Sequence, residues 1–233
     1  MTDHFKEIYD RQAEQYERLV MREDYQQNIL PALNKIRPLA GLEVVEMGAG
    51  TGRLTCLLAP IVKSIQAFDI SPPMLEVAIA KLERMNLQNW TVQVSDNRNL
   101  PVEDQTADLA IAGWSFGHST VWQVERWREE IAQAVSEMKR VLRPGGLTII
   151  IETMGTGSET PHPPSQALAA YYAFLEQEQG FSYTWIRTDY KFESLAEAEA
   201  LSRFFFGDEL AEQVVNNNWV ILPECTGIWW SIV

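Results

Sequence analysis

Five short apolar runs, rich in valine and isoleucine, recur in the first two thirds of the chain with helical segments between them. They are Leu42–Met47, Ile65–Ile70, Trp90–Ser95, Ala107–Trp114 and Leu147–Glu152. Each run is long enough for one strand, and its composition is typical of a strand buried on both faces. Strands that alternate with helices through short connections predict a parallel sheet covered on both sides. We therefore expect the α/β class, with a doubly wound, Rossmann-like sheet.

The helices between these strands have recognisable starts and ends. Ser71 can cap a helix that has Pro72 in its first turn and continues to Leu82. Apolar residues at every third or fourth position predict another helix, which ends at Arg143–Gly146. This stripe consists of Trp127, Ile131, Val135, Met138 and Leu142. The link Asp96–Gln105 is short for a crossover helix and is the weakest point of the predicted topology.

Further elements flank this core. One helical face is expected from Phe5 to Leu19. Gly155–Pro164 has the composition of a loop, and Ser165 is expected to cap a helix that ends near Gln179. Two final strands are expected to pair antiparallel at the sheet edge, with a helical piece between them. These strands are Tyr183–Phe192 and Trp219–Val233.

Composition and charge narrow the possible partners. The 233 residues are 46% hydrophobic and 22% charged, which favours a folded domain with a sizeable core. Lys and Arg total 19 against 32 Asp and Glu, so the net charge is −13 and a nucleic-acid partner is not expected. No signal peptide or membrane span is evident, which predicts a soluble, cytoplasmic protein with no membrane partner. Cys56 and Cys225 lack the paired spacing of a zinc or redox site, so no metal is expected.

A glycine-rich turn joins the first strand to the helix after it. Gly48, Gly50 and Gly52 let the backbone approach a ligand closely, and the helix N-terminus presents unpaired N–H groups to an anionic group. A dinucleotide fingerprint would need another glycine where this chain has Arg53. Asp69 ends the second strand, where its carboxylate can accept hydrogen bonds from both hydroxyls of a ribose. The turn and the acidic strand end together are a stronger signal than the turn alone.

The order of these features resembles that of the class I S-adenosylmethionine-dependent methyltransferases, over about residues 40–154. In that family an acidic residue at the end of the first strand precedes Gly-x-Gly-x-Gly, and here Glu46 stands before the turn. The resemblance implies that S-adenosylmethionine is the cofactor. It also implies that Glu46 lies near the methionine amino group and that the glycine turn borders the methionine and the ribose.

The resemblance assigns the remaining cofactor contacts to later strand ends. It implies that Asp69 holds the ribose hydroxyls and that Ile70 packs on the adenine, with Met74 added to that apolar wall. Asp96, after the third strand, matches the residue that accepts a hydrogen bond from the adenine amino group. The expected cofactor-binding residues are Tyr16, Glu46, Gly48, Gly50, Gly52, Asp69, Ile70, Met74, Asp96, Asn97 and Trp114.

The resemblance also implies how the chain is organised. Residues 1–233 are expected to form one methyltransferase domain. Its parts are an N-terminal helical cap (1–40), a cofactor-binding core (41–154) and an acceptor-side insertion with the final strands (155–233). Tyr9 and Tyr16 share one side of the cap, where they either close over the cofactor, with the Tyr16 hydroxyl near its carboxylate, or only dock the helix on the sheet. Arg53 is either a ligand contact or a solvated helix residue.

The segment after the fourth strand indicates the kind of acceptor. Methyltransferases that act on amino groups of DNA bases typically carry Asn or Asp, then Pro-Pro and an aromatic residue, whereas this chain has Gly113–His118. Together with the negative charge, this favours a small-molecule acceptor, as in the broad group that includes quinone-biosynthesis methyltransferases. The many aromatic residues after the fifth strand can wall an acceptor pocket.

His118 is the candidate catalytic residue, because it follows the fourth strand, close to where a donor methyl group should point. It either removes a proton from the acceptor or is hydrogen-bonded to the loop backbone. A sulfonium donor is already activated, so alignment alone can supply much of the acceleration. Two other functions stay open. One is a nicotinamide-dependent oxidoreductase, against which Arg53 counts, and the other is a non-catalytic S-adenosylmethionine-binding protein.

Overall fold

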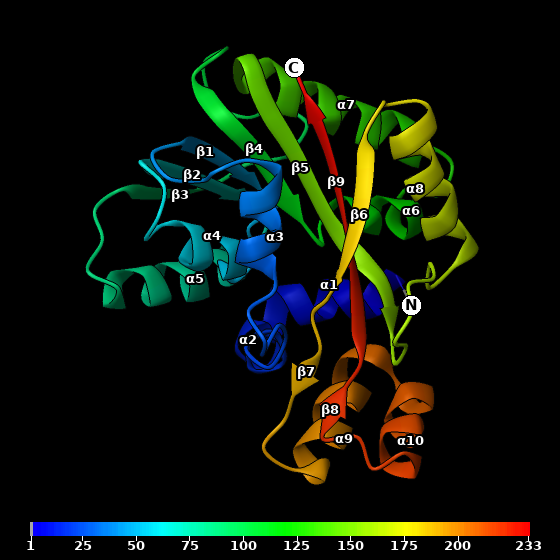
Figure 1. The fold of residues 1–233 in the computed structure, drawn as a ribbon. Coiled ribbons are helices and arrows are strands. Elements are labelled where there is room, and N and C mark those ends of the chain that lie inside the picture. Colours follow the sequence, from blue (N-terminus) through cyan, green and yellow to red (C-terminus); the bar gives the residue numbers. More distant parts are fainter. Residues whose placement is uncertain (1) are drawn as a thin grey trace.

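A seven-stranded sheet forms the centre of the fold (Figure 1). The computed structural model describes residues 2–233. The strands of this sheet are β1 (Glu43–Met47), β2 (Ser64–Asp69), β3 (Trp90–Val94), β4 (Ala107–Gly113), β5 (Leu142–Thr156), β6 (Ser182–Arg187) and β9 (Glu224–Ile232). Their order is β3-β2-β1-β4-β5-β9-β6, in which β1 to β5 are parallel and β9 runs antiparallel to both of its neighbours. The predicted α/β class with an antiparallel edge is confirmed.

Consecutive residues of the central strands pack into different hydrophobic cores, so the sheet is buried on both faces. On β5, Ile149 and Ile151 pack with Val44 on one side, whereas Ile150 packs with Val45 on the other. Each of these side chains is at most 1% exposed. Full burial of a valine or isoleucine contributes about 1.5–3 kcal/mol, which explains why the apolar runs become the middle of the molecule.

Helices cover both faces of the sheet (Figure 1). One face is covered by α3 (Ile29–Ile36), α4 (Arg53–Leu58) and α5 (Pro72–Arg84), and the other by α7 (Trp127–Val141) and α8 (Gln166–Gln177). Ser165 caps α8 as predicted, because its hydroxyl oxygen accepts a hydrogen bond from Leu168 N–H. Ser71 stands at the N-cap of α5 with Pro72 after it, as predicted, but its hydroxyl makes no cap hydrogen bond and instead donates to the Tyr9 carbonyl oxygen (3.0 Å).

The N-terminal segment forms two helices rather than one. α1 (Thr2–Arg11) and α2 (Ala13–Val20) meet at Gln12, whose backbone leaves the helical region (φ −130°, ψ 29°). The continuous helical face expected from Phe5 to Leu19 is therefore broken. Both helices contact α5, and they cover the edge of the sheet at which the parallel strands end (Figure 1).

A small lobe lies beyond the same edge of the sheet, between β6 and β9 (Figure 1). It contains β7 (Tyr190–Lys191), α9 (Leu195–Phe206), α10 (Asp208–Asn216) and β8 (Ile221–Leu222), with β7 and β8 paired antiparallel. Leu201, Val214 and Leu222 form its core together with Leu19 of α2. Each of the two final strands expected from the sequence is therefore divided into two shorter ones, β6 and β7 in the first and β8 and β9 in the second. The lobe that contains β7 and β8 packs against the N-terminal helices.

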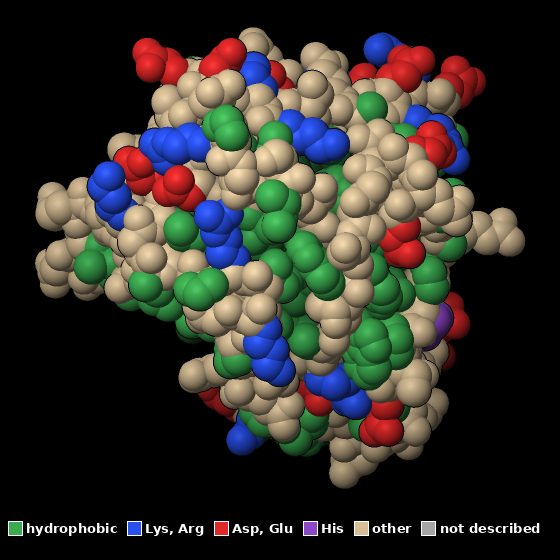
Figure 2. Space-filling model, turned by 45° about the horizontal axis from the view of Figure 1, so that its top comes forward, with side chains coloured by type: hydrophobic (Ala, Val, Ile, Leu, Met, Phe, Trp, Pro, Cys, Tyr) green, Lys and Arg blue, Asp and Glu red, His purple; other side chains and the backbone are tan. Residues whose placement is uncertain are grey.

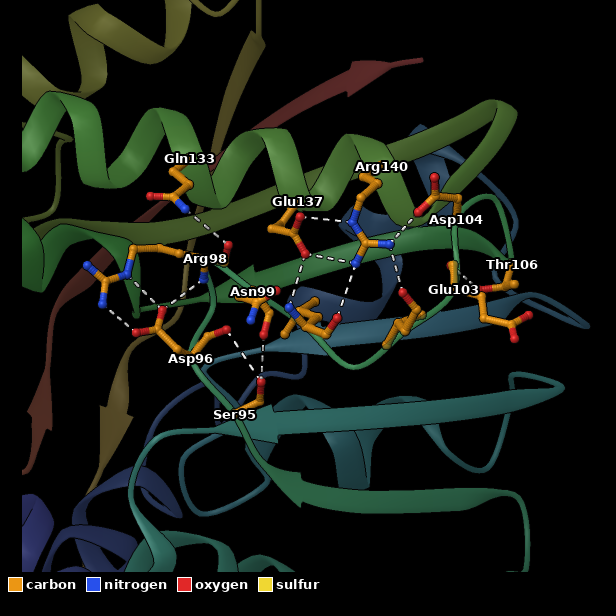
Figure 3. A network of polar contacts seen from close by, with 12 residues as sticks. Ser95, Asp96, Arg98, Asn99, Glu103, Asp104, Thr106, Gln133, Glu137 and Arg140 are labelled. Carbon is orange, nitrogen blue, oxygen red and sulfur yellow. Dashed lines mark hydrogen bonds and ion pairs between the residues drawn. The ribbon is translucent and has the colours of Figure 1, made fainter.

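The link between β3 and β4 contains no helix, as its length suggested, and polar contacts hold it on α7 (Figure 3). Arg140 donates to the Leu100 and Val102 carbonyl oxygens and pairs with Asp104. Glu137, one turn earlier on α7, accepts from the Leu100 N–H (3.0 Å). The connection is therefore fixed by side chains of the neighbouring helix instead of by a helix of its own.

One face of the molecule combines apolar and charged surface. Figure 2 shows hydrophobic side chains gathered towards the middle of this face, with charged side chains of both signs interspersed around them. Large apolar side chains that are exposed in the molecule include Trp185, Ile221 and Ile232. Within residues 2–233, no helix is both long enough and apolar enough to cross a membrane.

Candidate active site

A cavity of about 510 Å³ lies where β1, β2 and β4 end, under α1 and α2. Its walls include η1 (Phe116–His118) and α6 (Ser119–Trp122), which follow β4. The cavity brings together all but one of the predicted site residues. Those that line it are Tyr16, Glu46, Gly48, Gly50, Asp69, Ile70, Met74, Asp96, Asn97, Trp114 and His118. Its lining contains no described residue after Ala134, so the segment expected on the acceptor side does not border it directly.

The exception among the predicted residues is Gly52, which serves the packing of the turn. Its φ is +77°, and a β-carbon there would lie 2.8 Å from the Ala78 β-carbon on α5. Gly48 is required for a different close approach, because a β-carbon at φ +71° would lie 1.9 Å from Ser115 Oγ. The turn is thus held tightly between α5 and the segment after β4, with its backbone facing the cavity.

Asp69 is held by the backbone at the end of β2. Its carboxylate accepts hydrogen bonds from Gly50 N–H and Ser71 N–H, each at 2.8 Å. Burial raises the pKa of this carboxyl, while the two amide donors act in the opposite direction. The bonds link β2, the glycine turn and the start of α5, so Asp69 presents a fixed acceptor to the cavity.

Glu46 is a buried carboxyl group with no ion-pair partner among the described residues. It is 2% exposed and accepts a hydrogen bond from the Thr55 hydroxyl (2.6 Å). Burial raises its pKa to about 8. A ligand ammonium group beside it would favour the ionised carboxylate, since an opposite charge lowers the pKa of an acid.

Apolar side chains at the ends of β2 and β3 are exposed beside the glycine turn. Ile70 is 66% exposed and lines the cavity, and Val94 is 51% exposed. Met74 is buried, and its methyl group lies 3.5 Å from where a β-carbon of Gly50 would stand. Ile70 and Met74 thus offer an apolar wall of the cavity on which an aromatic ring can pack.

Asp96 and Asn97 differ in how free they are to bind a ligand. The Asp96 carboxylate accepts hydrogen bonds from the backbone N–H and the guanidinium of Arg98, which hold the pKa of Asp96 below its usual value (Figure 3). Asn97 donates to Ser115 Oγ (3.2 Å), whereas its side-chain oxygen is buried without a partner. Asn97 therefore offers a free acceptor for a ligand amino group, and the acceptor capacity of Asp96 is already shared with Arg98.

Arg53 and Trp114 form a contact that the sequence did not reveal. The Arg53 guanidinium lies 4.0 Å from the centre of the Trp114 ring and pairs with Glu23 at 2.6 Å. Arg53 Nη2 is buried without a hydrogen-bond partner. Arg53 is thus not the solvated helix residue considered above, and it lines the cavity.

His118 is joined to the N-terminal helix. Its Nε2 lies 2.9 Å from the Tyr9 hydroxyl, and its ring stacks on Trp122 with 4.7 Å between ring centres. The ring also bonds the backbone at Trp114, and we assign Nε2 as the acceptor of the Tyr9 proton. Burial lowers the pKa of His118 to about 4, which keeps the imidazole neutral at pH 7. His118 has the features that both interpretations require, because it is bonded to the loop backbone and also lines the cavity.

The residues present fit S-adenosylmethionine in chemistry. Glu46 provides an acid for an ammonium group, and Asp69 provides an acceptor for hydroxyl groups. Ile70 and Asn97 provide an apolar surface and an unpartnered oxygen for an aminated ring. The cavity volume falls in the range of roughly 300–1,000 Å³ that is typical of small-molecule sites.

Comparison with known proteins agrees with this geometry. Residues 45–150 match the family described as "Methyltransferase domain". A protein of Escherichia coli, YafE, is 31% identical over 110 residues, which are 47% of this chain and 49% of the relative. A methyltransferase of Anoxybacillus flavithermus is 24% identical over 210 residues, 88% of this chain and 89% of the relative. The chain thus spans about half the length of the first relative and most of the second.

Two further comparisons concern a quinone enzyme and a solved structure. A demethylmenaquinone methyltransferase of Tropheryma whipplei is 26% identical over 154 residues, 65% of this chain and 59% of the relative. The structure of a SAM-dependent methyltransferase from Aquifex aeolicus shares the fold, with a TM-score of 0.58 at 16% identity, over 100% of this chain and 99% of that one. Residues 45–150 thus match a methyltransferase domain, and the chain shares the fold of a SAM-dependent methyltransferase.

Proposed function

We propose that this protein transfers the methyl group of S-adenosylmethionine to a small molecule that binds in the same cavity. One observation carries the proposal: a single cavity of about 510 Å³ is lined both by the glycine turn and Asp69 and by the Tyr9–His118 pair. The cofactor and the acceptor must share this volume, which leaves room only for a small acceptor. A nucleic-acid segment or a folded protein is not expected to fit.

The proposed roles of the residues follow from their contacts. Asp69 holds the ribose hydroxyls, and Glu46 holds the methionine amino group. Ile70 supports the adenine, and Asn97 accepts from its amino group. The remaining cofactor contacts come from Tyr16, Gly48, Gly50, Met74, Asp96 and Trp114.

The acceptor is proposed to lie between α1 and the segment after β4. That part of the cavity is lined by Phe116 and Trp122 in addition to Tyr9 and His118. The aromatic walls suit a planar ring, which is in keeping with the relative named demethylmenaquinone methyltransferase. The small lobe supports this wall from outside, because the ring of Phe205 lies 5.4 Å from that of Tyr16 between ring centres.

The Tyr9–His118 pair is proposed to accept the proton that the acceptor loses. When bound, the cofactor supplies an electrophilic methyl group on a sulfonium. As the acceptor's nucleophilic atom forms its bond to the methyl carbon and the carbon–sulfur bond breaks, the acceptor's proton passes to Tyr9 Oη. The Tyr9 proton moves to His118 Nε2, 2.9 Å away. Burial under α1 also keeps water from the reacting atoms.

The proposed domain organisation follows from the same arrangement. Residues 1–233 act as one methyltransferase domain, in which 1–40 cap the site, 41–154 hold the cofactor and 155–233 complete the sheet and support the acceptor side. The contacts of α1 and α2 with α5 and of α2 with α9 join these parts around one cavity.

Replacing Tyr9 with phenylalanine tests the proton path. The variant keeps the ring, which lies 5.4 Å from that of Tyr16, and loses only the hydroxyl that bonds His118. We expect kcat to fall by about 10²-fold or more, while the affinity for S-adenosylhomocysteine stays within a fewfold of the parent. Steady-state kinetics and calorimetry measure the two quantities. A kcat close to that of the parent would show that Tyr9 only helps to cover the cavity and takes no part in proton transfer.

The experiment that tests the proposed function is a screen with isotopically labelled donor. The protein is incubated with metabolite fractions and S-adenosylmethionine that carries a deuterated methyl group, and mass spectrometry detects labelled products. We expect one small molecule to gain the label, with much less label gained when the Asp69→Ala variant replaces the parent at a donor concentration near the parent's Kd. Binding of S-adenosylhomocysteine without transfer to any fraction would favour a non-catalytic binding protein.

A thermal-shift comparison distinguishes the remaining alternative. S-adenosylhomocysteine is expected to raise the melting temperature, because Asp69 and Glu46 match its ribose and amino group. Nicotinamide dinucleotides are expected to leave it unchanged, since Arg53 stands where close pyrophosphate approach needs a glycine. The opposite result would support an oxidoreductase.

A further inference from the structure

A buried carboxyl group lies directly behind the turn that carries His118. Glu152 of β5 is 4% exposed, and its Oε1 accepts hydrogen bonds from Gly117 N–H (2.9 Å) and from the Tyr171 hydroxyl (3.3 Å). A β-carbon at Gly117 would lie 3.1 Å from Glu152 Oε2, so the carboxyl group packs directly against the backbone of the turn. Glu152 does not line the cavity, and its backbone hydrogen bond to the site is made to this turn.

The turn is held at a few points, one of which is the bond from the Thr120 hydroxyl to the Gly117 carbonyl oxygen (2.8 Å). Trp114 starts it with a positive φ of 51°, and its N–H donates to the Ile151 carbonyl oxygen (2.7 Å). At the other end, the bond from His118 N–H to the Ser115 carbonyl oxygen is 3.4 Å long, at the weak limit of hydrogen-bond geometry. The bond between Gly117 N–H and Glu152 is shorter, so Glu152 is one of the contacts that fix the turn on which His118 stands.

The surroundings of Glu152 contain no balancing cation. The titratable groups that face it are the hydroxyls of Tyr171 and Tyr172 on α8 and of Tyr9 on α1, whose pKa values are raised in part by its negative charge. No ion pair in the described part of the chain includes Glu152. A buried carboxylate is unfavourable without such a partner, and here the donors that favour it are the amides of the turn. A turn with only a structural role does not require a buried carboxyl group without a cation partner.

We propose that Glu152 is a positioning residue for methyl transfer, whose ionised carboxylate accepts from Gly117 N–H and so holds His118 Nε2 against the Tyr9 hydroxyl. This inference rests on the proposed function. Protonation of Glu152 would turn one oxygen into a donor, which competes with the backbone N–H groups for the same space. The turn would then loosen, and His118 would lose its alignment with Tyr9.

The two buried groups differ in the pH at which they titrate. Burial raises the pKa of Glu152 to about 7, whereas burial lowers the pKa of His118 to about 4. Glu152 becomes ionised as the pH rises through about 7, so activity should increase over that interval. His118 is already neutral near pH 7, so a change there does not come from His118. Burial also raises the pKa of Glu46 to about 8, so only the part of the change that Glu152→Gln removes reports Glu152.

The test compares the pH dependence of kcat/KM in four proteins. The parent is expected to lose activity as the pH falls through about 7. Glu152→Gln should lose this pH dependence and have a kcat at least about tenfold lower, since a misplacement of 1 Å can cost about 10²-fold. Tyr171→Phe should move the acid limb, the fall of kcat/KM at low pH, to higher pH, because the Tyr171 hydroxyl stabilises the ionised carboxylate of Glu152. Tyr172→Phe is the matched control: its hydroxyl donates to the Thr153 carbonyl oxygen (2.6 Å), and its loss should leave the limb in place.

A second readout needs no acceptor and so separates this inference from the proposed function. In protein labelled at histidine, the ring signals of His118 are assigned from their absence in His118→Ala. These signals should shift with a midpoint near pH 7 in the parent, and should not do so in Glu152→Gln. If the screen finds no acceptor but the shift is present, the proposed function fails while the link from Glu152 to His118 stands.

Three results would overturn the proposal. They are an unchanged acid limb in Glu152→Gln, an unmoved limb in Tyr171→Phe, and His118 signals that do not change near pH 7 in the parent. If Glu152→Gln does not fold, Tyr171→Phe and the parent titration still decide, since neither removes the carboxyl group.

Discussion

Replacing His118 with alanine is expected to lower kcat by about 10²–10⁴-fold, while the affinity for S-adenosylhomocysteine stays within a fewfold of the parent. The imidazole accepts from the Tyr9 hydroxyl at 2.9 Å and is neutral at pH 7, so its Nε2 lone pair is free to receive the proton that methyl transfer releases. The groups proposed to hold the cofactor, such as Asp69 and Glu46, lie on other strands. Kinetics with the acceptor found in the screen and calorimetry with S-adenosylhomocysteine measure the two effects.

A double variant shows whether the two side chains act as a unit. If Tyr9 passes its proton to His118, the variant with both Tyr9→Phe and His118→Ala should be little worse than the worse single variant. Independent roles would instead multiply the two losses. A His118→Ala protein within a fewfold of parent activity would leave alignment and donor reactivity to carry the reaction.

Replacing Asp69 with alanine is expected to weaken S-adenosylhomocysteine binding by about 1.5–3 kcal/mol, the range for hydrogen bonds to a charged group. This corresponds to a Kd roughly ten- to a hundredfold higher. The carboxylate is fixed by Gly50 N–H and Ser71 N–H, so it reaches the ribose hydroxyls without having to be ordered first. Calorimetry gives the affinity directly.

The same amide bonds require a control for the Asp69 variant. Loss of the carboxylate also frees the two backbone N–H groups, so thermal unfolding of the unliganded proteins must show that the fold survives. Asp69→Asn keeps one acceptor oxygen in nearly the same shape and should lose less affinity than Asp69→Ala. An affinity for S-adenosylhomocysteine that is unchanged in Asp69→Ala would rule out its assignment to the ribose.

The sheet could be predicted from the sequence because its evidence is local. Runs such as Leu147–Glu152 are apolar on both faces, and only a central strand between two layers of helices buries them fully. The break at Gln12 could not be foreseen, because its cause is tertiary: α1 and α2 both pack on α5, while Leu19 packs into the core of the small lobe. A continuous apolar face in the sequence does not reveal such a change of direction.

The cavity residues could be predicted where they belong to one strand end, as with Glu46 and Asp69. The contacts that orient the site residues or change their pKa values could not be predicted, because most of these contacts join residues far apart in the chain. Arg98 engages Asp96 from two positions away, but whether it turns towards Asp96 depends on Glu130 of α7, with which it also pairs. Glu152 was visible only as the end of an apolar run, and its bond to Gly117 depends on how β5 lies beside β4.

The helix-free link between β3 and β4 gives the two ends of the cofactor site different sensitivities to ionic strength. Arg98 and Arg140, which hold this link, are partly exposed, so dissolved salt screens their ion pairs. Asp69 is instead held by the N–H groups of Gly50 and Ser71, on which salt has little effect. Rising salt should therefore weaken the proposed contacts with the adenine, while the proposed contacts of Asp69 with the ribose remain and hold the cofactor increasingly by its sugar.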